Sequence, residues 1–191
     1  MLNPTAPAPI LARLRTATRP YHDAVEQNEF NQALAAGTPS EAATARFLAK
    51  MYGFLAPYEA ALLGHAAALG PAWELPERRR AHLILEDLRA APGQLPQCPA
   101  MPPLATGPQL LGAMYVLEGS TLGGQVLARQ LAKAGSDQLR YFTGYGALTG
   151  PRWKAFCQLL GAAATDAATE EEIVQSAIHT FQHLASWLAR P

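Results

Sequence analysis

A histidine followed one helical turn later by a carboxylate is the clearest chemical signal in the sequence. His22 and Glu26 are four residues apart in YHDAVEQNEF, so on a helix their side chains share one face. A carboxylate in that position can accept the proton on one imidazole nitrogen, which leaves the other nitrogen free to bind a metal. On spacing alone, however, an exposed pair that contributes a few tenths of a kcal/mol is the more common outcome.

The remaining histidines give weaker signals. His179 and His183 are also four residues apart, but no third metal ligand is evident, and a core or surface role is more common for such a pair. His65 and His82 have no sequence neighbour that singles them out. His22 is therefore the histidine with the best case for a chemical role.

Three glycines lie inside an otherwise helical stretch, MYVLEGSTLGGQVLARQL at residues 114–131. Gly119, Gly123 and Gly124 each cost about 1 kcal/mol relative to alanine in a helix interior. The stretch lacks the lysine of a P-loop and follows no strand, so a nucleotide site is not indicated. Two interpretations remain open. The small residues at positions 119, 120, 123 and 124 could let another helix pack closely, or bare backbone could lie against a flat ligand.

Helical periodicity dominates the chain and predicts an all-α, single-domain bundle that holds these residues in place. The first helix is expected to start at Ile10, to kink or restart near Pro20, and to end at Gly37. Residues 92–108 are rich in proline and predict a surface loop. The further predicted helices are 40–70 (with a bend at Pro57), 76–91, 108–134, 151–164 and 170–189. Residues 1–9 are expected to form a flexible tail, and residues 10–191 the domain.

Composition limits the classes of function. Of the 191 residues 49% are hydrophobic, and 15 basic residues balance 15 acidic ones, so the chain can bury a core and has no basic footprint for nucleic acid. The two cysteines, Cys98 and Cys157, form no CxxC pair and predict no disulfide framework. The chain has no apolar run of membrane-spanning length and no signal-peptide pattern at its start. We expect a soluble, cytoplasmic protein that binds neither nucleic acid nor a membrane.

The two stretches together resemble those of haem oxygenases. LRTATRPYHDAVEQNEF resembles their proximal helix, in which the pattern L-x-x-A-T-x-x-x-H-x-x-x-E-x-x-x-F carries the axial histidine. YVLEGSTLGGQVLARQL resembles their kinked distal helix, and the same order of helices continues through RYFTGYGALTGPRWKAF and HTFQHLASWL. The resemblance extends from about Ile10 to Leu188, nearly the whole chain.

The resemblance implies a helical bundle in which haem is sandwiched between the proximal and the distal helix. It implies cleavage of haem to biliverdin, carbon monoxide and ferrous iron, with haem as both substrate and cofactor and with molecular oxygen and reductant consumed. The chain has no dinucleotide fingerprint, so electrons are expected from an external donor such as a ferredoxin or a reductase. A biliverdin acceptor is a further expected partner. The main alternative is a non-catalytic haem carrier or sensor on the same fold.

A third possibility, a thiaminase-like relative on the same fold, is disfavoured. That family would require a catalytic cysteine and clustered carboxylates in its pocket. Cys98 lies in the proline-rich loop, and Cys157 has no evident activating partner in the sequence.

Residue roles follow from the same resemblance. His22 would be the axial ligand of the haem iron, and Glu26 would orient its imidazole ring. Arg15 and Lys154 match basic positions that contact the haem propionates, where directional Arg–carboxylate bonding would help to fix which edge of the ring faces inward.

Two aromatic residues complete the expected binding site, and two positions depart from the family pattern. A tyrosine that contacts a propionate in some members falls on Met114 here, with Tyr115 one position away, and a further basic contact falls on Gln158. Tyr115 and Phe181 are expected to contact the haem.

The distal helix departs from the best-known members. Many haem oxygenases have G-D-x-S-G-G-Q where this chain has GSTLGGQ, so Ser120 replaces the aspartate that anchors a water network. The sequence is more similar to a bacterial subgroup with G-S-x-L-G, which includes iron-acquisition and phytochrome-associated enzymes. Gly119, Ser120, Gly123 and Gly124 are the expected catalytic residues. The proton that activates oxygen has no obvious side-chain source in this motif.

Overall fold

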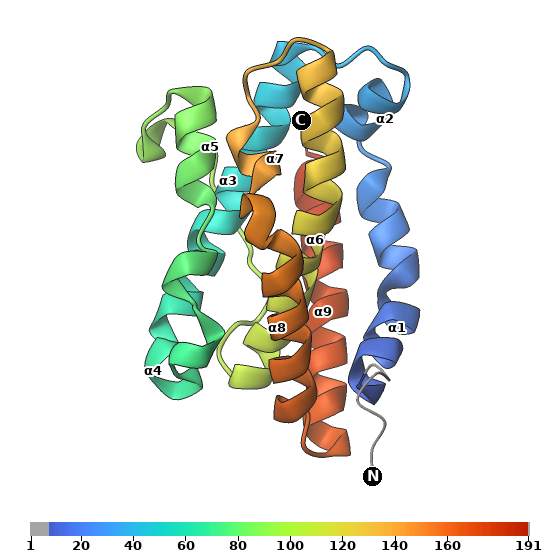
Figure 1. Ribbon diagram of the computed structural model, residues 1–191, viewed down its shortest axis with the longest axis vertical. Helices are drawn as coiled ribbons and strands as arrows, with labels where there is room; N and C mark the ends of the chain where they lie inside the picture. The colour runs from blue at the N-terminus through green and yellow to red at the C-terminus, as the bar shows by residue number, and fades with distance from the viewer. Residues whose placement is uncertain (1–7, 191) are drawn as a thin grey trace.

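The computed structural model describes residues 8–190, and every regular element in that range is a helix (Figure 1). The all-α prediction is therefore confirmed. The longer helices are α1 (Pro9–Glu26), α3 (Glu41–Gly64), α6 (Gly107–Lys133), α8 (Thr149–Ala163) and α9 (Ala167–Leu188). The shorter ones are α2 (Glu29–Ala35), α4 (Ala66–Leu69), α5 (Ala81–Leu88) and α7 (Arg140–Thr143), with single 3-10 turns η1 (Pro71–Trp73), η2 (Pro76–Arg78), η3 (Pro92–Gln94) and η4 (Gly146–Leu148).

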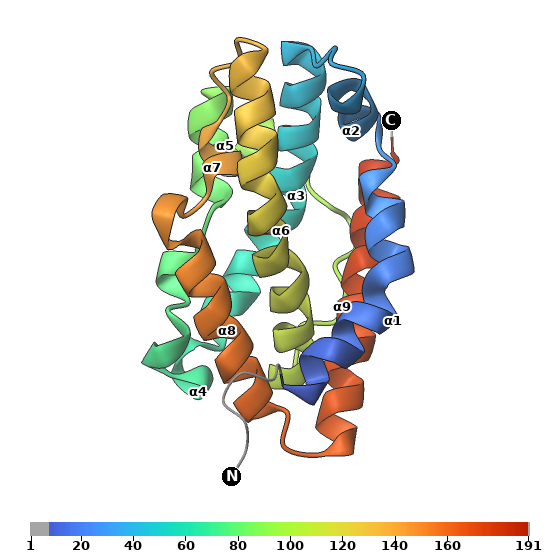
Figure 2. The same ribbon diagram turned by 45° about the vertical axis from the view of Figure 1, so that its right-hand side comes forward.

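Helix α9 packs against α1, α3 and α6. Both α6 and α1 pack along it, whereas α1 and α6 hardly touch each other, as Figures 1 and 2 show. The contact between α6 and α9 is very close, because a Cβ atom on Gly112 would lie 2.4 Å from the carbonyl oxygen of Ile173. Buried residues recur at helical spacing on the inner face of α6, as Leu110, Met114 and Leu117. Because α1 and α6 both pack on α9 but hardly touch each other, space can remain between them.

The first predicted helix is wrong at its C-terminal end. Helix α1 starts at Pro9 and runs through Pro20 without interruption, but it ends at Glu26 and not at Gly37. The side chain of Asn28 accepts a hydrogen bond from the amide of Asn31 at 2.9 Å and caps α2. Asn28 has helix-forming residue types on both sides and no neighbouring glycine or proline, so periodicity alone conceals the break. Most of the predicted tail, residues 1–9, lies outside the described residues.

The other predicted boundaries are mostly close. Ser40 caps α3 by accepting from the amide of Ala43 at 3.1 Å, and Thr106 with Gln109 forms a capping box at the start of α6. The helix predicted over 76–91 is shorter. The Glu59 carboxylate on α3 accepts hydrogen bonds from the backbone amides of Arg80 and Ala81, so α5 begins there. A cap supplied from a distant helix leaves no local signal in the sequence.

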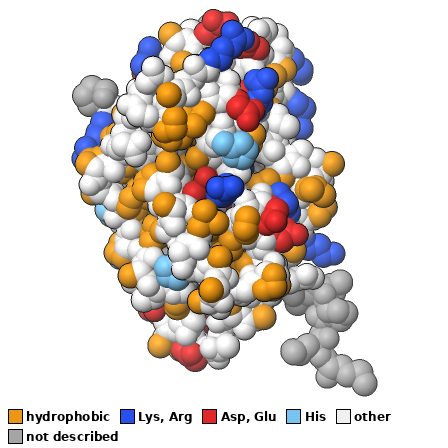
Figure 3. All heavy atoms as spheres, turned by 90° about the vertical axis from the view of Figure 1, so that its left-hand side faces the viewer, with side chains coloured by type: hydrophobic (Ala, Val, Ile, Leu, Met, Phe, Trp, Pro, Cys, Tyr) orange, Lys and Arg blue, Asp and Glu red, His pale blue; other side chains and the backbone are white. Residues whose placement is uncertain are grey.

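The surface carries charges of both signs. On the face shown in Figure 3, acidic and basic side chains are interspersed and hydrophobic ones are scattered between them. Among the described residues, no helix combines the length and the hydropathy that a membrane span requires.

Candidate functional site

A cavity of about 560 Å³ lies between α1 and α6, within the range of roughly 300–1,000 Å³ typical of small-molecule sites. One wall comes from α1 and the opposite wall from the glycine-containing part of α6. Apolar and aromatic side chains close the remaining sides, namely Phe47, Met51, Phe142, Trp153, Phe181 and Leu184. The cavity is therefore a predominantly apolar slot between two helices.

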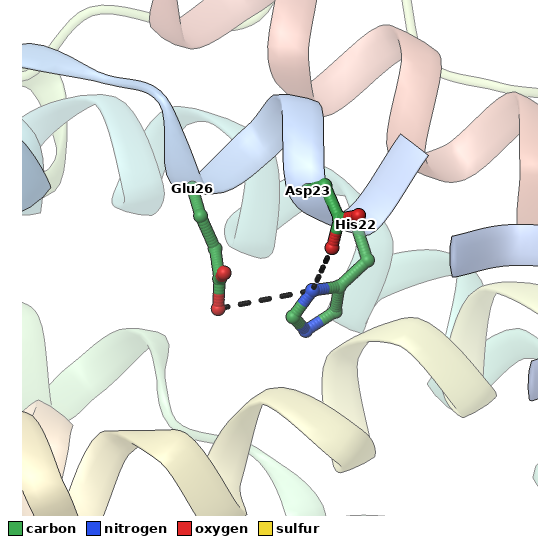
Figure 4. Close-up of side chains that lie close together, drawn as sticks. All are labelled: His22, Asp23 and Glu26. Atoms are coloured by element: carbon green, nitrogen blue, oxygen red, sulfur yellow. Dashed lines mark ion pairs between the residues drawn. The ribbon is translucent and has the colours of Figure 1, made fainter. Parts of the chain in front are cut away.

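His22 extends from α1 on the side that faces α6 (Figure 4). Its Nδ1 atom lies 3.7 Å from a carboxylate oxygen of Glu26 and 3.9 Å from one of Asp23. The Nε2 atom is on the far side of the ring from these carboxylates. Carboxylates beside one nitrogen favour the tautomer that leaves the lone pair of the other nitrogen free for a metal.

The His22 side chain is partly exposed to solvent and packs against one aromatic ring. Its side chain is 54% exposed, and its ring meets the edge of Phe181 with centroids 5.8 Å apart. The ligand atoms of His22, Asp23 and Glu26 lie within 4.8 Å of one another, so the three side chains could also hold a metal ion. The structure thus brings the predicted His22–Glu26 pair together and adds Asp23 to it.

The three glycines of α6 have three different environments. Helix α6 stays helical through the whole segment. A Cβ atom on Gly124 would lie 2.7 Å from the carbonyl oxygen of Phe142, and one on Gly119 would meet the Trp153 ring at 3.5 Å. A Cβ atom on Gly123 would meet nothing within 4 Å, and Gly123 lines the cavity. Close backbone packing and an open ligand face, the two interpretations of the sequence, therefore apply to different glycines.

Ser120 lines the cavity, but its hydroxyl is already engaged. It donates a hydrogen bond to the carbonyl oxygen of Leu117 at 2.7 Å. Since a hydroxyl has a single proton to donate, Ser120 cannot donate it to a ligand without breaking this bond.

The basic residues of the cavity come mainly from α1. Arg15 lines it as expected, and so does Arg19, which the sequence analysis missed although it follows Arg15 by four residues. Tyr115 lies beside them, and burial raises the pKa of its hydroxyl. Lys154 is exposed on α8 and is not among the residues that line the cavity.

A buried polar cluster adjoins the cavity and was also missed. Arg78 and Glu118 form an ion pair in which both side chains are at most 3% exposed. The Tyr145 hydroxyl lies 2.8 Å from the same carboxylate. Arg80, which lines the cavity, donates from Nη2 to the carbonyl oxygen of Leu117 at 2.8 Å. These residues are too far apart in sequence for spacing to connect them.

The other histidines and the cysteines stand outside the cavity lining. His183 places Nδ1 3.1 Å from the carbonyl oxygen of Ala100, and His65 places Nδ1 3.0 Å from that of Ala61. Burial raises the pKa of the Cys157 thiol to about 11, so this thiol is protonated at neutral pH and a poor nucleophile.

Comparisons with known proteins agree with one another. A family model described as heme oxygenase matches residues 71–190. A heme oxygenase of Xanthomonas campestris pv. campestris (strain 8004) is 32% identical over 162 residues, which cover 83% of this chain and 96% of that protein.

Solved structures share the same fold. The heme oxygenase of Leptospira interrogans superposes with a TM-score of 0.80 at 19% identity and covers 94% of this chain and 98% of its own. The NO- and CO-bound heme oxygenase of Neisseria meningitidis gives a TM-score of 0.74 at 22% identity, with coverages of 94% and 89%.

Proposed function

The chain belongs to the haem oxygenase family, and we propose on that premise that the cavity between α1 and α6 is where it binds haem and cleaves it to biliverdin. The enzyme is a haem oxygenase by family, and a carrier or sensor without turnover is correspondingly not favoured. The observation that carries the location is the pairing of His22 on one wall with the open face of Gly123 on the other. A flat, metal-containing substrate needs a ligand on one side and little bulk on the opposite side.

His22 is our proposed axial ligand of the haem iron. Its Nε2 atom is free of the carboxylates that flank Nδ1, and its ring is supported on one edge by Phe181. Glu26 is then the residue that holds the ring orientation, with Asp23 as a second carboxylate near Nδ1. Groups of this kind set the tautomer of a metal-binding histidine and raise its basicity.

Two guanidinium groups would receive the acidic edge of the haem. Arg15 and Arg19 line the cavity together with Tyr115, and guanidinium groups bind carboxylates directionally. We propose that the propionates lie toward these residues. Lys154 remains a proposed second contact, because it follows Trp153 of the cavity wall and carries a long, flexible side chain.

The distal wall would control the space above the iron. Gly119, Ser120, Gly123 and Gly124 all line the cavity, and Gly123 leaves the most room. Bound haem would supply the iron at which oxygen is activated. These residues would keep side-chain bulk away from that iron and would hold water at the Leu117–Ser120 turn. We also propose that the electrons come from an external ferredoxin or reductase and that carbon monoxide and ferrous iron are the other products.

The function is tested by adding haem, a reductant and oxygen to the purified protein. We expect the Soret absorption to decay as biliverdin and carbon monoxide form. Chromatography of the product would identify the biliverdin isomer. A Soret band that stays stable, with no biliverdin, would instead establish a haem carrier or sensor.

Replacing Ser120 with alanine is expected to change little. The hydroxyl donates to a carbonyl of its own helix, so its removal should leave haem affinity unaltered and slow turnover by less than about threefold. Haem titration and single-turnover kinetics would measure the two effects separately. Loss of turnover with haem still bound would show that the Ser120 hydroxyl delivers the proton itself.

A further inference from the structure

Helices α3 and α9 are joined by reciprocal hydrogen bonds of Lys50 and Trp187, which we call the Lys50 clasp. The Nζ atom of the half-buried Lys50 donates to the carbonyl oxygen of Leu188 at 2.9 Å and also to that of Arg190. In return, Nε1 of Trp187 donates to the backbone carbonyl oxygen of Lys50 at 2.7 Å. Each helix therefore supplies both a side-chain donor and a backbone acceptor.

The clasp caps the C-terminal end of α9 from another helix. The last carbonyl groups of a helix have no partner within it, and a basic side chain beside them is stabilising. Helix α9 has no basic residue in its own last turn, so Lys50 of α3 provides the positive charge. The Trp187 ring is also fitted to α3, since a Cβ atom on Gly53 would lie 3.1 Å from it. The clasp thus fixes the end of α9 against the middle of α3.

Residues beside the clasp form part of the cavity lining, which we call the clasp wall. Its members are Phe47, which precedes Lys50 by three residues, and Leu184 and Leu188, which flank Trp187. Phe47 and Leu188 also line a second cavity of about 330 Å³. Because the wall has space on both sides, it makes fewer packing contacts that resist its displacement. Its position therefore depends on the clasp.

The clasp wall lies at the end of the cavity opposite Arg15. Helices α1 and α9 run side by side in the same direction (Figure 2), because Arg13 pairs with Glu170 near their starts. Farther along both helices, His22 contacts Phe181. Arg15 therefore lies before the level of His22, and the clasp wall lies beyond it. A flat ring whose acidic edge is held at Arg15 has its opposite edge at the clasp wall.

We propose that the Lys50 clasp helps to determine which meso carbon of haem is cleaved, because it fixes the clasp wall against the ring edge opposite the propionates. The inference rests on the proposed function. Lys50 and Trp187 are positioning residues, since neither of them lines the haem cavity. Without the clasp, the wall can move toward the second cavity, and the ring can turn or sink deeper. The reaction then yields a different mixture of biliverdin isomers.

The clasp itself is tested on the haem-free protein with Lys50→Met, which removes the donors and keeps an unbranched side chain. The melting temperature should fall by about 2–4 °C, and the amides in the last turn of α9 should exchange with deuterium faster. Lys50→Arg should restore both values, because a guanidinium can also donate to two carbonyl groups. Arg46→Met is the matched control, since Arg46 is exposed on α3 and pairs with Glu29. Unchanged exchange in Lys50→Met would overturn the proposal.

The effect on the reaction is tested by chromatography of the biliverdin that Lys50→Met forms. We expect the ratio of isomers to change by at least about threefold, since a displacement of about 1 Å far from the chemistry can change a rate about 100-fold. Lys50→Arg should return the ratio toward that of the unsubstituted protein, and Arg46→Met should leave it as it was. A clasp that only stabilises the fold would lower the melting temperature of Lys50→Met without changing the isomer ratio, and that result would overturn the proposal.

The position of the ring can also be measured without turnover. The proton resonances of the haem methyl groups in the ferric cyanide complex report how the ring is oriented, and we expect them to shift in Lys50→Met but not in Arg46→Met. Unshifted resonances in Lys50→Met would contradict the proposal. If the unsubstituted protein binds haem but forms no biliverdin, the proposed function fails, whereas this comparison still decides whether the clasp positions the ring.

Discussion

Replacing His22 with alanine is expected to abolish the axial coordination of haem iron and to lower turnover by at least about 100-fold. Among the histidines, His22 is the one that lines the cavity. Its flanking carboxylates lie at Nδ1, so in the proposed assignment Nε2 is the atom that the substitution would remove from the iron. The absorption and electron paramagnetic resonance spectra of the ferric complex would report the lost nitrogen ligand directly.

The control for this substitution is His82→Ala. His82 is exposed on α5 and does not line the cavity, so its removal should leave the spectrum and the turnover as they were. Added imidazole should restore the spectrum of His22→Ala, because the substitution leaves room for it next to the iron. An unchanged haem spectrum in His22→Ala would show that another residue is the ligand.

The helices could be predicted from sequence wherever local signals set their ends. Ser40 begins α3, and the stretch predicted as 108–134 forms α6, Gly107–Lys133. The two failures have different causes. The start of α5 depends on Glu59, which is 21 residues from Arg80, and the α1–α2 break depends on a single asparagine at a position that also suits a helix.

The residues around the cavity also fall into two groups, those with a local sequence signal and those without one. His22, Glu26 and the glycines are carried by two continuous sequence motifs, and the structure places all of them around one cavity. The buried polar cluster of Arg78, Glu118 and Tyr145 could not be found in this manner, because the Arg78–Glu118 pair spans 40 residues and the Tyr145–Glu118 contact spans 27. Each member reads in sequence as an ordinary charged or aromatic residue. Only tertiary packing brings these residues together and buries them.

Substituting the adjacent glycines of α6 separately should give opposite effects on stability. In Gly124→Ala, the new methyl group would lie 2.7 Å from the Phe142 carbonyl oxygen, and backbone cannot move aside cheaply. We expect the free energy of unfolding to fall by about 1–3 kcal/mol, as for other overpacked sites. In Gly123→Ala nothing lies within 4 Å, so the helix should gain up to about 1 kcal/mol. Urea denaturation of the haem-free proteins would measure both.

The effects of the two substitutions on haem binding should be in the reverse order, with Gly123→Ala impaired more than Gly124→Ala. The methyl group of Gly123→Ala enters the cavity, so this more stable protein should bind haem more weakly and turn it over more slowly. The folded fraction of the Gly124→Ala protein should lose less haem affinity, because the added methyl group points toward Phe142 on α7. Equal effects of both substitutions on stability and on haem binding would mean that the glycines serve one common purpose. The opposite signs expected here follow from one glycine admitting a neighbouring backbone and the other leaving room for the substrate.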